Sequence, residues 1–310
     1  MEEYSYQNRR DFLKYMVGTS AVLAGFPSLS KGVMKKNNLV KLTILYTNDV
    51  HSRIEPFPLS DPKYPDMGGF ARRSAVVESI RKENDNVLLL DAGDVFQGTP
   101  YFNLYQGELE YKLMSLMKYD ATTIGNHEFD LGIDNIAKQM PYANFSLINC
   151  NYDFSNTSLH KKIIPYKVFE KQGLKIGVLG YGIELEGLVD KKMYKDTVYQ
   201  NPLPIANATA KHLKKDLACD YVIALSHIGF SYNEKKISDM NMAPLTENID
   251  LIIGGHTHTF LEHPVQLKNK TGKDVYVTQV GWAGIWLGKI DVIFSLDTKK
   301  IIHNSDNKKI

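Results

Sequence analysis

The sequence predicts an α/β fold whose largely parallel strands are completed by antiparallel ones. From Lys41 onward, apolar and β-branched runs of strand length alternate with segments of helical periodicity, an arrangement typical of α/β domains. Toward the C-terminus, strand-like runs follow one another without helices between them, which indicates antiparallel pairing. The 310 residues are 43% hydrophobic and 23% charged, so there is ample apolar material for a core.

The expected strands are apolar runs that end in small or polar residues. Residues 86–94 (NVLLLDAGD) are a continuous apolar run with a glycine turn, the mark of a buried strand. The other expected strands are residues 41–48, 121–126, 145–151, 174–182, 220–227, 249–256, 274–281 and 285–296. The last two have the pattern of antiparallel strands, so the sheet is expected to be mixed.

Four segments between these strands have the periodicity of helices. They are residues 68–84, 107–120, 132–140 and 205–218. The first carries an apolar stripe at Phe70, Val77 and Ile80. The last repeats apolar residues at i, i+4, i+7 and i+11, namely Ala206, Ala210, Leu213 and Leu217. Each stripe predicts one helix face packed against a sheet.

The first thirty residues have the composition of an export signal. Arg9 and Arg10 precede an apolar run that is too short and too rich in small residues to span a bilayer. The pattern resembles a bacterial twin-arginine signal, although Asn8 stands where Ser or Thr is usual. A disordered basic tail is the alternative. We therefore expect residues 1–30 to direct export, to the periplasm in a bacterium.

The rest of the chain is expected to form one domain over residues 38–297, followed by a polar tail over residues 298–310. A net charge of +2 predicts affinity for neither nucleic acid nor a membrane surface. Cys150 and Cys219 fit no metal or redox spacing, and each adjoins an expected strand. This placement favours two buried thiols and leaves a disulfide as the alternative.

Five expected strands end in side chains that can bind metal ions. These side chains are Asp49, His51, Asp94, Asn126, His227, His256 and His258. A single histidine after a strand is more often a hydrogen-bonded core residue than a ligand, but open α/β sheets place their sites at this edge. Imidazole, carboxylate and amide groups together suit divalent Zn, Mn or Fe. Seven candidates exceed one tetrahedral site and are enough for two ions that share a carboxylate.

The ordered set D-x-H, G-D, G-N-H-E, H and G-H-x-H resembles the calcineurin-like metallophosphoesterase superfamily. More narrowly, the motifs resemble the N-terminal catalytic domain of bacterial 5′-nucleotidases over about residues 41–260. The stretches that carry this likeness are LTILYTNDVHSRIEP, GGFARRSAVV, LLLDAGDVFQGTP, TIGNHEFDLG and IIGGHTHT. The resemblance implies a four-layer αββα sandwich in which a metallophosphatase catalytic domain occupies residues 38–297.

The resemblance also implies a role for each side chain of the site. One metal ion would be held by Asp49, His51 and His258. The other would be held by Asn126, His227 and His256, and Asp94 would bridge the two. His127 would face the substrate as a cation supported by Asp130, and would stabilise charge on the transferring group and the leaving oxygen. Some relatives carry Gln or Asn at the position of His258, so the metal preference is open.

The implied reaction is hydrolysis of phosphate monoesters, with 5′-nucleotides as the first candidates, by in-line attack of a metal-bound hydroxide. Two alternatives stay open: a sulfate-ester hydrolase of sulfur oxidation, and a metal-binding subunit without activity. Glu128 and Phe129 are expected to be structural.

Full-length nucleotidases of this family carry a second domain that stacks the nucleotide base, and we do not expect that domain within these residues. A separately encoded recognition domain is therefore a candidate partner. No aromatic pair near the motifs resembles a base clamp, and Phe96 and Phe129 are the candidates for such a contact. Histidines outside the motifs, His303 among them, are expected at the surface.

Overall fold

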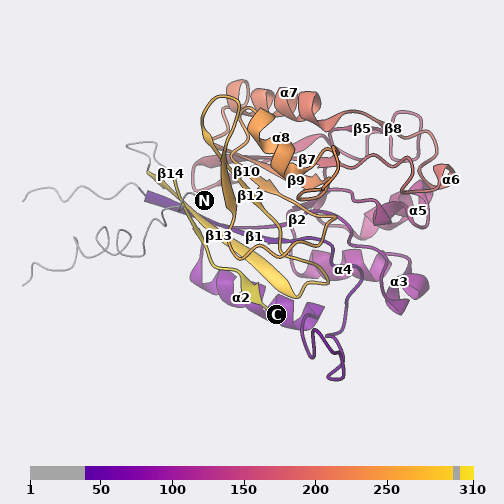
Figure 1. The fold of residues 1–310 in the computed structure, drawn as a ribbon. Coiled ribbons are helices and arrows are strands. Elements are labelled where there is room, and N and C mark those ends of the chain that lie inside the picture. The colour runs from indigo at the N-terminus through magenta and orange to yellow at the C-terminus, as the bar shows by residue number, and fades with distance from the viewer. Residues whose placement is uncertain (1–38, 296–300) are drawn as a thin grey trace, which may run out of the picture. The chain divides into compact units, whose positions relative to one another are not determined.

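Two sheets form the centre of the domain in the computed structural model, which describes residues 39–295 and 301–310 (Figure 1). The export signal expected over residues 1–30 lies outside the described residues. The first sheet has the strand order β14-β13-β1-β2-β3-β4, with β15 beside β13. Its strands are β1 (Leu39–Thr47), β2 (Val87–Asp91), β3 (Ala121–Thr122), β4 (Ser146–Leu147), β13 (Trp286–Ser295), β14 (Ile301–Ser305) and β15 (Lys308–Lys309).

The second sheet has the order β11-β12-β10-β9-β7-β6. Its strands are β6 (Tyr166–Lys171), β7 (Leu174–Gly182), β9 (Tyr221–His227), β10 (Leu251–Ile253), β11 (Val265–Lys268) and β12 (Asp274–Thr278). The four inner strands are parallel, whereas β6 and β11 close the two edges in antiparallel pairing. A separate pair joins β5 (Tyr152–Asp153) and β8 (Val198–Tyr199).

The two sheets face each other, and helices cover their outer faces. Side chains of β1 and β2 such as Ile44 and Leu88 share one buried cluster with Ile176 of β7 and Ile223 of β9. The helices over the first sheet are α2 (Phe70–Glu83), α3 (Pro100–Tyr105), α4 (Glu108–Leu116) and α5 (Ile133–Gln139), and those over the second are α7 (Pro202–Lys215) and α8 (Asp239–Met242) (Figure 1). This order of layers confirms the predicted αββα sandwich.

Shorter helical turns connect these layers. They are α6 (Lys191–Tyr194), η1 (His127–Phe129), η2 (Met140–Tyr142) and η3 (Ala243–Leu245). The helix expected from residue 205 begins at Pro202, because the Asn201 side chain accepts a hydrogen bond from the amide of Leu203 and Pro202 takes the first helical position. In α2 the predicted stripe of Phe70, Val77 and Ile80 is buried.

Several sequence expectations need correction. The expected strands 121–126 and 145–151 shrink to two residues each, because the chain leaves the sheet to form loops of the site. Strands β12 and β13 lie in different sheets, and β6 and β11 were not predicted. The segment taken as a polar tail is also part of the fold, since β14 pairs with β13 over Ile301 to Ser305.

Cys150 and Cys219 are free thiols, so the disulfide alternative is wrong. Among the described residues, none of the helices has the length and apolar character that crossing a bilayer requires.

Candidate metal centre

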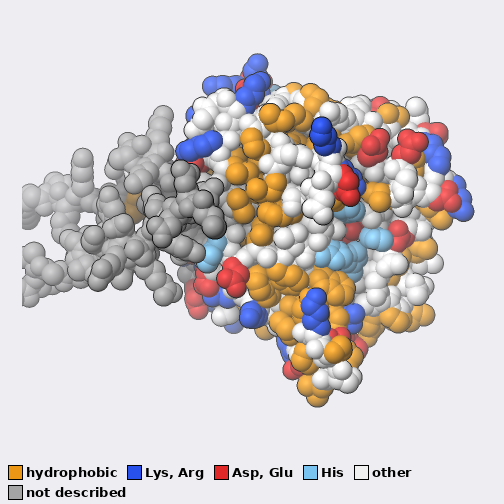
Figure 2. Space-filling view, viewed as in Figure 1, with side chains coloured by type: hydrophobic (Ala, Val, Ile, Leu, Met, Phe, Trp, Pro, Cys, Tyr) orange, Lys and Arg blue, Asp and Glu red, His pale blue; other side chains and the backbone are white. Residues whose placement is uncertain are grey.

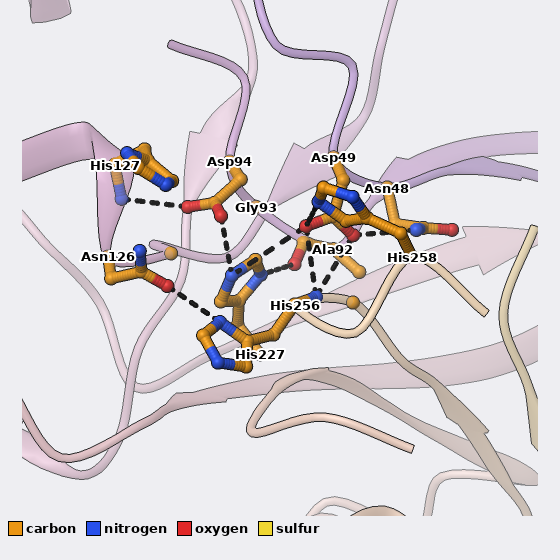
Figure 3. A network of polar contacts seen from close by, with 12 residues as sticks. Asn48, Asp49, Ala92, Gly93, Asp94, Asn126, His127, His227, His256 and His258 are labelled. Atoms are coloured by element: carbon orange, nitrogen blue, oxygen red, sulfur yellow. Dashed lines mark hydrogen bonds and ion pairs between the residues drawn. The ribbon is translucent and has the colours of Figure 1, made fainter. Parts of the chain in front are cut away.

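The structure brings the seven predicted ligands together at the carboxyl ends of the strands. Figure 3 labels all of them except His51. His227 is the last residue of β9, and the others lie in loops that follow β1, β2, β3 and β10. Their donor atoms form two groups, each within 4.8 Å of one another: Asp49, His51 and His258 in the first, and Asp94, His227 and His256 in the second. Asn126 joins the second group, since its Oδ1 lies 2.8 Å from Nδ1 of His256.

Five of these ligands have a positive backbone φ. They are Asp49 (49°), His51 (47°), Asp94 (56°), His256 (74°) and His258 (53°). Left-handed backbone costs a side-chain-bearing residue about 1–3 kcal/mol, and it persists only where the surroundings impose it. The bends direct side chains from consecutive loop residues toward one point. Concentrated strain of this kind is a mark of a functional site.

The first group is tied together through Asp49. Nε2 of His258 lies 3.4 Å from Oδ1 of Asp49, and Nε2 of His51 lies 3.9 Å from the same oxygen. The two Nε2 atoms of His51 and His258 are 3.0 Å apart. Two imidazole nitrogens and a carboxylate oxygen therefore converge on one small volume, as the ligands of a cation do.

The second group is centred on Asp94. Nε2 of His227 lies 3.0 Å from Oδ2 of Asp94, while Nε2 of His51 lies 4.0 Å from that oxygen. One carboxylate oxygen thus faces both groups. His227 is completely buried, and its Nε2 has no hydrogen-bond partner of good geometry.

Backbone carbonyls fix the orientation of two of the imidazoles. Nδ1 of His227 lies 2.6 Å from the carbonyl oxygen of Ala92, and Nδ1 of His51 lies 3.3 Å from that of Phe96. A carbonyl can only accept, so each Nδ1 carries a proton and donates. Each Nε2 is then the atom directed at the centre. Histidine ligands of metals are held in this way.

The charge states also suit a cation. Burial lowers the pKa of His256 to about 4, so this imidazole is neutral and has a free lone pair. Burial opposes protonation of His227, but the neighbouring Asp94 carboxylate raises the pKa of His227 to about 10. In the same pair burial favours protonated Asp94, yet the charge of His227 holds the pKa of Asp94 far below its usual value. A divalent ion would take the place of the proton that compensates Asp94 here.

His127 and Asp130 form a hydrogen-bonded pair beside the second group. His127 is the first residue of the short turn η1, and Asp130 directly follows this turn. Nδ1 of His127 donates to Oδ2 of Asp130 at 2.9 Å. This hydrogen bond is the main reason that the pKa of His127 is raised, to about 9. The backbone amide of His127 donates to Oδ1 of Asp94 at 2.8 Å. The pair is therefore anchored to the carboxylate that both groups share.

Glu128 and Gly125 hold the loops of the site in place through contacts that were not predicted from the sequence. Glu128 is buried, and its carboxylate accepts from the amides of Asp94 (3.0 Å), Val95 (2.7 Å) and Gly125 (2.6 Å). The pKa of Glu128 rises to about 7 because of burial and the charge of Asp94. A Cβ at Gly125 would collide with the Asp94 carboxylate, so this glycine allows a close approach as well as a turn.

A second support holds the loop that carries Asp49. Nδ2 of Asn48 donates to Oδ2 of Asp49 at 2.7 Å and to the carbonyl of Gly281 at 2.6 Å. Asn48 lies in the NDVH motif, so its position was visible in the sequence, but its partner 233 residues away was not. Phe96 and Phe129, the two candidates for a contact with a base, are both fully buried, so neither ring is available for such a contact.

Comparisons with known proteins agree with this geometry. The family described as calcineurin-like phosphoesterase matches residues 42–260. The snake venom 5′-nucleotidase of Crotalus adamanteus is 32% identical over 295 residues, which cover 86% of this chain and 47% of the venom protein. The chain thus spans about half the length of the curated relatives it matches.

Two solved structures are also similar. A 5′-nucleotidase precursor from Thermus thermophilus superposes with a TM-score of 0.79 at 30% identity, covering 87% of this chain and 55% of that one. The NAD nucleotidase of Haemophilus influenzae gives a TM-score of 0.77 at 27% identity, covering 88% and 56%. The family match spans most of the sandwich and every predicted ligand. The chain is therefore a member of the calcineurin-like phosphoesterase family.

Proposed function

We propose that this site holds two divalent metal ions and hydrolyses phosphate monoesters, with 5′-nucleotides as the substrate class. One ion would be bound by Asp49, His51 and His258, and the other by Asn126, His227 and His256. Asp94 would be shared. The observation that carries this proposal is the position of Asp94 Oδ2, which lies 3.0 Å from Nε2 of His227 and 4.0 Å from Nε2 of His51. Zn, Mn and Fe suit this donor set.

When bound, the ions would supply positive charge to the phosphoryl group and lower the pKa of a coordinated water. The residues of the chain provide the geometry. The hydrogen bond to Asp130 holds the proton on Nδ1 of His127 and leaves Nε2 to face the substrate. A protonated Nε2 can donate to the leaving oxygen as the ester bond breaks. Since the amide of His127 is held by Asp94, the ring is positioned relative to both ligand groups.

The 5′-nucleotide assignment is supported by the names of the similar proteins from Crotalus adamanteus and Thermus thermophilus. The intact ligand set and the His127–Asp130 pair favour an enzyme over a binding subunit without activity, because a pure binding role does not require a group that faces a leaving oxygen.

The test begins with protein freed of metal by a chelator and then reloaded with Zn²⁺ or Mn²⁺. We expect about two ions per chain by elemental analysis, and hydrolysis of AMP only in the reloaded protein. An aryl sulfate serves as the competing substrate. One ion per chain at full activity would overturn the two-ion assignment, and faster cleavage of the sulfate than of AMP would overturn the substrate assignment.

A further inference from the structure

Five aromatic side chains pack together next to the candidate metal centre, and four of them are partly exposed. This aromatic wall consists of Phe57, Tyr64, Phe260, Trp282 and Trp286. Neighbouring ring centroids are 5.0–6.2 Å apart, the spacing of interacting aromatic pairs. The wall is assembled from three segments: the loop before α2, the loop after β10, and the loop between β12 and β13 together with Trp286, the first residue of β13.

The wall is joined directly to a ligand of the site. The rings of Trp282 and His258 are stacked, with centroids 5.6 Å apart and an angle of 5° between their planes. The loop that carries Trp282 is also fixed to the first ligand group. The amide of Ala283 donates to the carbonyl of Asp49 at 2.7 Å, and Nδ2 of Asn48 donates to the carbonyl of Gly281 at 2.6 Å. The position of Trp282 is therefore set by the residues that would bind the metal.

Most of the wall lies apart from the main cores. It forms a small cluster with Ala283 and Ile285, and of its five residues only Trp286 also packs against a large buried cluster, the one between the two sheets. Phe57 is buried beneath it, whereas Tyr64, Phe260, Trp282 and Trp286 are all partly exposed. Figure 2 shows hydrophobic side chains next to a group of histidine side chains on this face of the molecule. Parts of four aromatic side chains of the wall are thus exposed to solvent.

We infer that the aromatic wall binds the planar organic group of the phosphate ester, with Trp282 as its main contact. This inference rests on the proposed function, because it takes the phosphate to lie at the two ligand groups. An ester held there must extend its organic group past an edge of the site, and at the edge formed by His258 the next surface is Trp282. Stacking on an indole tolerates any base, since every base has a π face.

The inference specifies a class of substrate rather than one base. Esters with an aromatic or heteroaromatic group would gain binding energy on the wall, and small aliphatic esters would not. The gain would be similar for purine nucleotides and aryl phosphates. No hydrogen-bonding group is needed for this preference, so the subsite differs in kind from one that reads the edges of a base.

The first experiment compares AMP with glycerol 2-phosphate on the metal-loaded protein. We expect Trp282→Ala to lower the ratio of the two kcat/KM values, AMP over glycerol 2-phosphate, about tenfold, since base stacking contributes about that much or more. Trp282→Phe should restore most of the ratio. The matched control is Tyr142→Ala, a partly exposed aromatic residue outside the wall, which should leave the ratio unchanged. If both substrates lose equally, Trp282 acts only by supporting His258, and the inference is overturned.

The second experiment needs no catalysis. Trp282 and Trp286 are the only two tryptophans of the chain, so Trp286→Phe leaves Trp282 as the single indole fluorophore. We expect AMP to quench its fluorescence in a saturable way, and the reciprocal variant Trp282→Phe to show at most half of that quenching. Equal quenching in the two variants, or none in either, would overturn the inference. Quenching without hydrolysis of AMP would contradict the proposed function and leave the binding surface intact.

Discussion

His227 and His258, one histidine from each candidate ligand group, differ in how deeply they are buried. In the second group His227 is completely buried, Asp94 has a side-chain exposure of 2%, and the imidazole of His227 is anchored to the carbonyl of Ala92. In the first group the side chain of His258 is 39% exposed and rests against Trp282. Each group has two buried residues and one partly exposed residue, so the difference lies between the individual histidines His227 and His258 and not between the whole groups.

The difference suits two roles within one site, one in fixing its geometry and one in varying its metal preference and substrate contact. If His227 binds a metal ion, its burial and fixed tautomer would hold the geometry of the site. If His258 does, its exposed position could be taken by an amide or a water molecule, so this position could vary in metal preference and in substrate contact. Asp94 connects the two groups, because its Oδ2 faces the histidines of both.

The largest effect is therefore expected from Asp94→Asn. An amide cannot supply the negative charge that two ions would share, and both groups should lose metal. We expect kcat to fall by about 10³-fold, the upper end of what removal of one charge-stabilising group costs. The control is Asp120→Asn, because Asp120 accepts from the amide of Leu89 at the opposite end of β3. If Asp94→Asn loses only one of the two ions, the carboxylate belongs to one group alone.

The next largest effect is expected at the His127–Asp130 pair, and it tests whether catalysis depends on a residue that is not itself a candidate metal ligand. We expect His127→Asn to lower kcat by about 10²-fold, as loss of a general acid does, with metal content unchanged. Asp130→Asn should act through His127, so the double variant should be little worse than His127→Asn alone. Additive losses in the two single variants would show that Asp130 has a separate role.

The positions of the predicted ligands could be found from the sequence, because each of them lies where an apolar strand ends. Asp49, Asp94 and His227 all follow or close runs such as NVLLLD and YVIALS, whose burial is plain from composition. The rule that sites lie beyond the carboxyl ends of strands then brings them to one edge. The layered sandwich came from the family resemblance, and the alternation of elements along the chain supplied only the fold class.

What could not be predicted depends on partners far apart in the sequence. The positive φ of Asp49 and the four backbone amides that donate to Glu128 are properties of loops packed against other loops. The aromatic wall joins segments more than 200 residues apart, so its rings look like ordinary surface residues along the chain. Strand β14 was missed for the same reason, since its polar residues become a strand only through pairing with β13.

Replacing one histidine in each group tests directly whether the buried His227 contributes more to metal affinity than the exposed His258. We expect His227→Gln to lower the affinity of the chain for Zn²⁺ by about 100-fold, because a buried fixed ligand has no substitute. His258→Gln should cost less than about tenfold, since a water or the new amide can complete the coordination at an exposed position. Competition against a chromophoric chelator gives both values. A larger loss for His258→Gln than for His227→Gln would reverse the assignment of the two roles.

The smallest effect is expected at His303, outside both groups, and concerns how the free energy of unfolding depends on pH. His303 of β14 was expected at the surface, but its ring packs against Tyr221 and Tyr276 of the second sheet, with centroids 5.7 Å and 4.1 Å away. Nε2 of His303 lies 2.6 Å from the hydroxyl of Tyr221, a contact that a neutral imidazole can accept. Burial lowers the pKa of His303 to about 4, and the charge of Asp274 opposes this only in part.

The sign of the resulting stability change follows from these values. The unfolded chain binds a proton at His303 near pH 6.5, while the folded chain does so only near pH 4. The contribution of His303 is therefore complete above pH 6.5 and is lost as the pH falls toward 4. Between pH 7 and pH 5, wild type should lose on the order of 1 kcal/mol more free energy of unfolding than His303→Gln, measured by urea denaturation. His160→Gln, at an exposed histidine, should behave as wild type. If His303→Gln loses as much stability as wild type, the acid sensitivity of the fold originates elsewhere, and the buried ligand group around His227 becomes the next region to test.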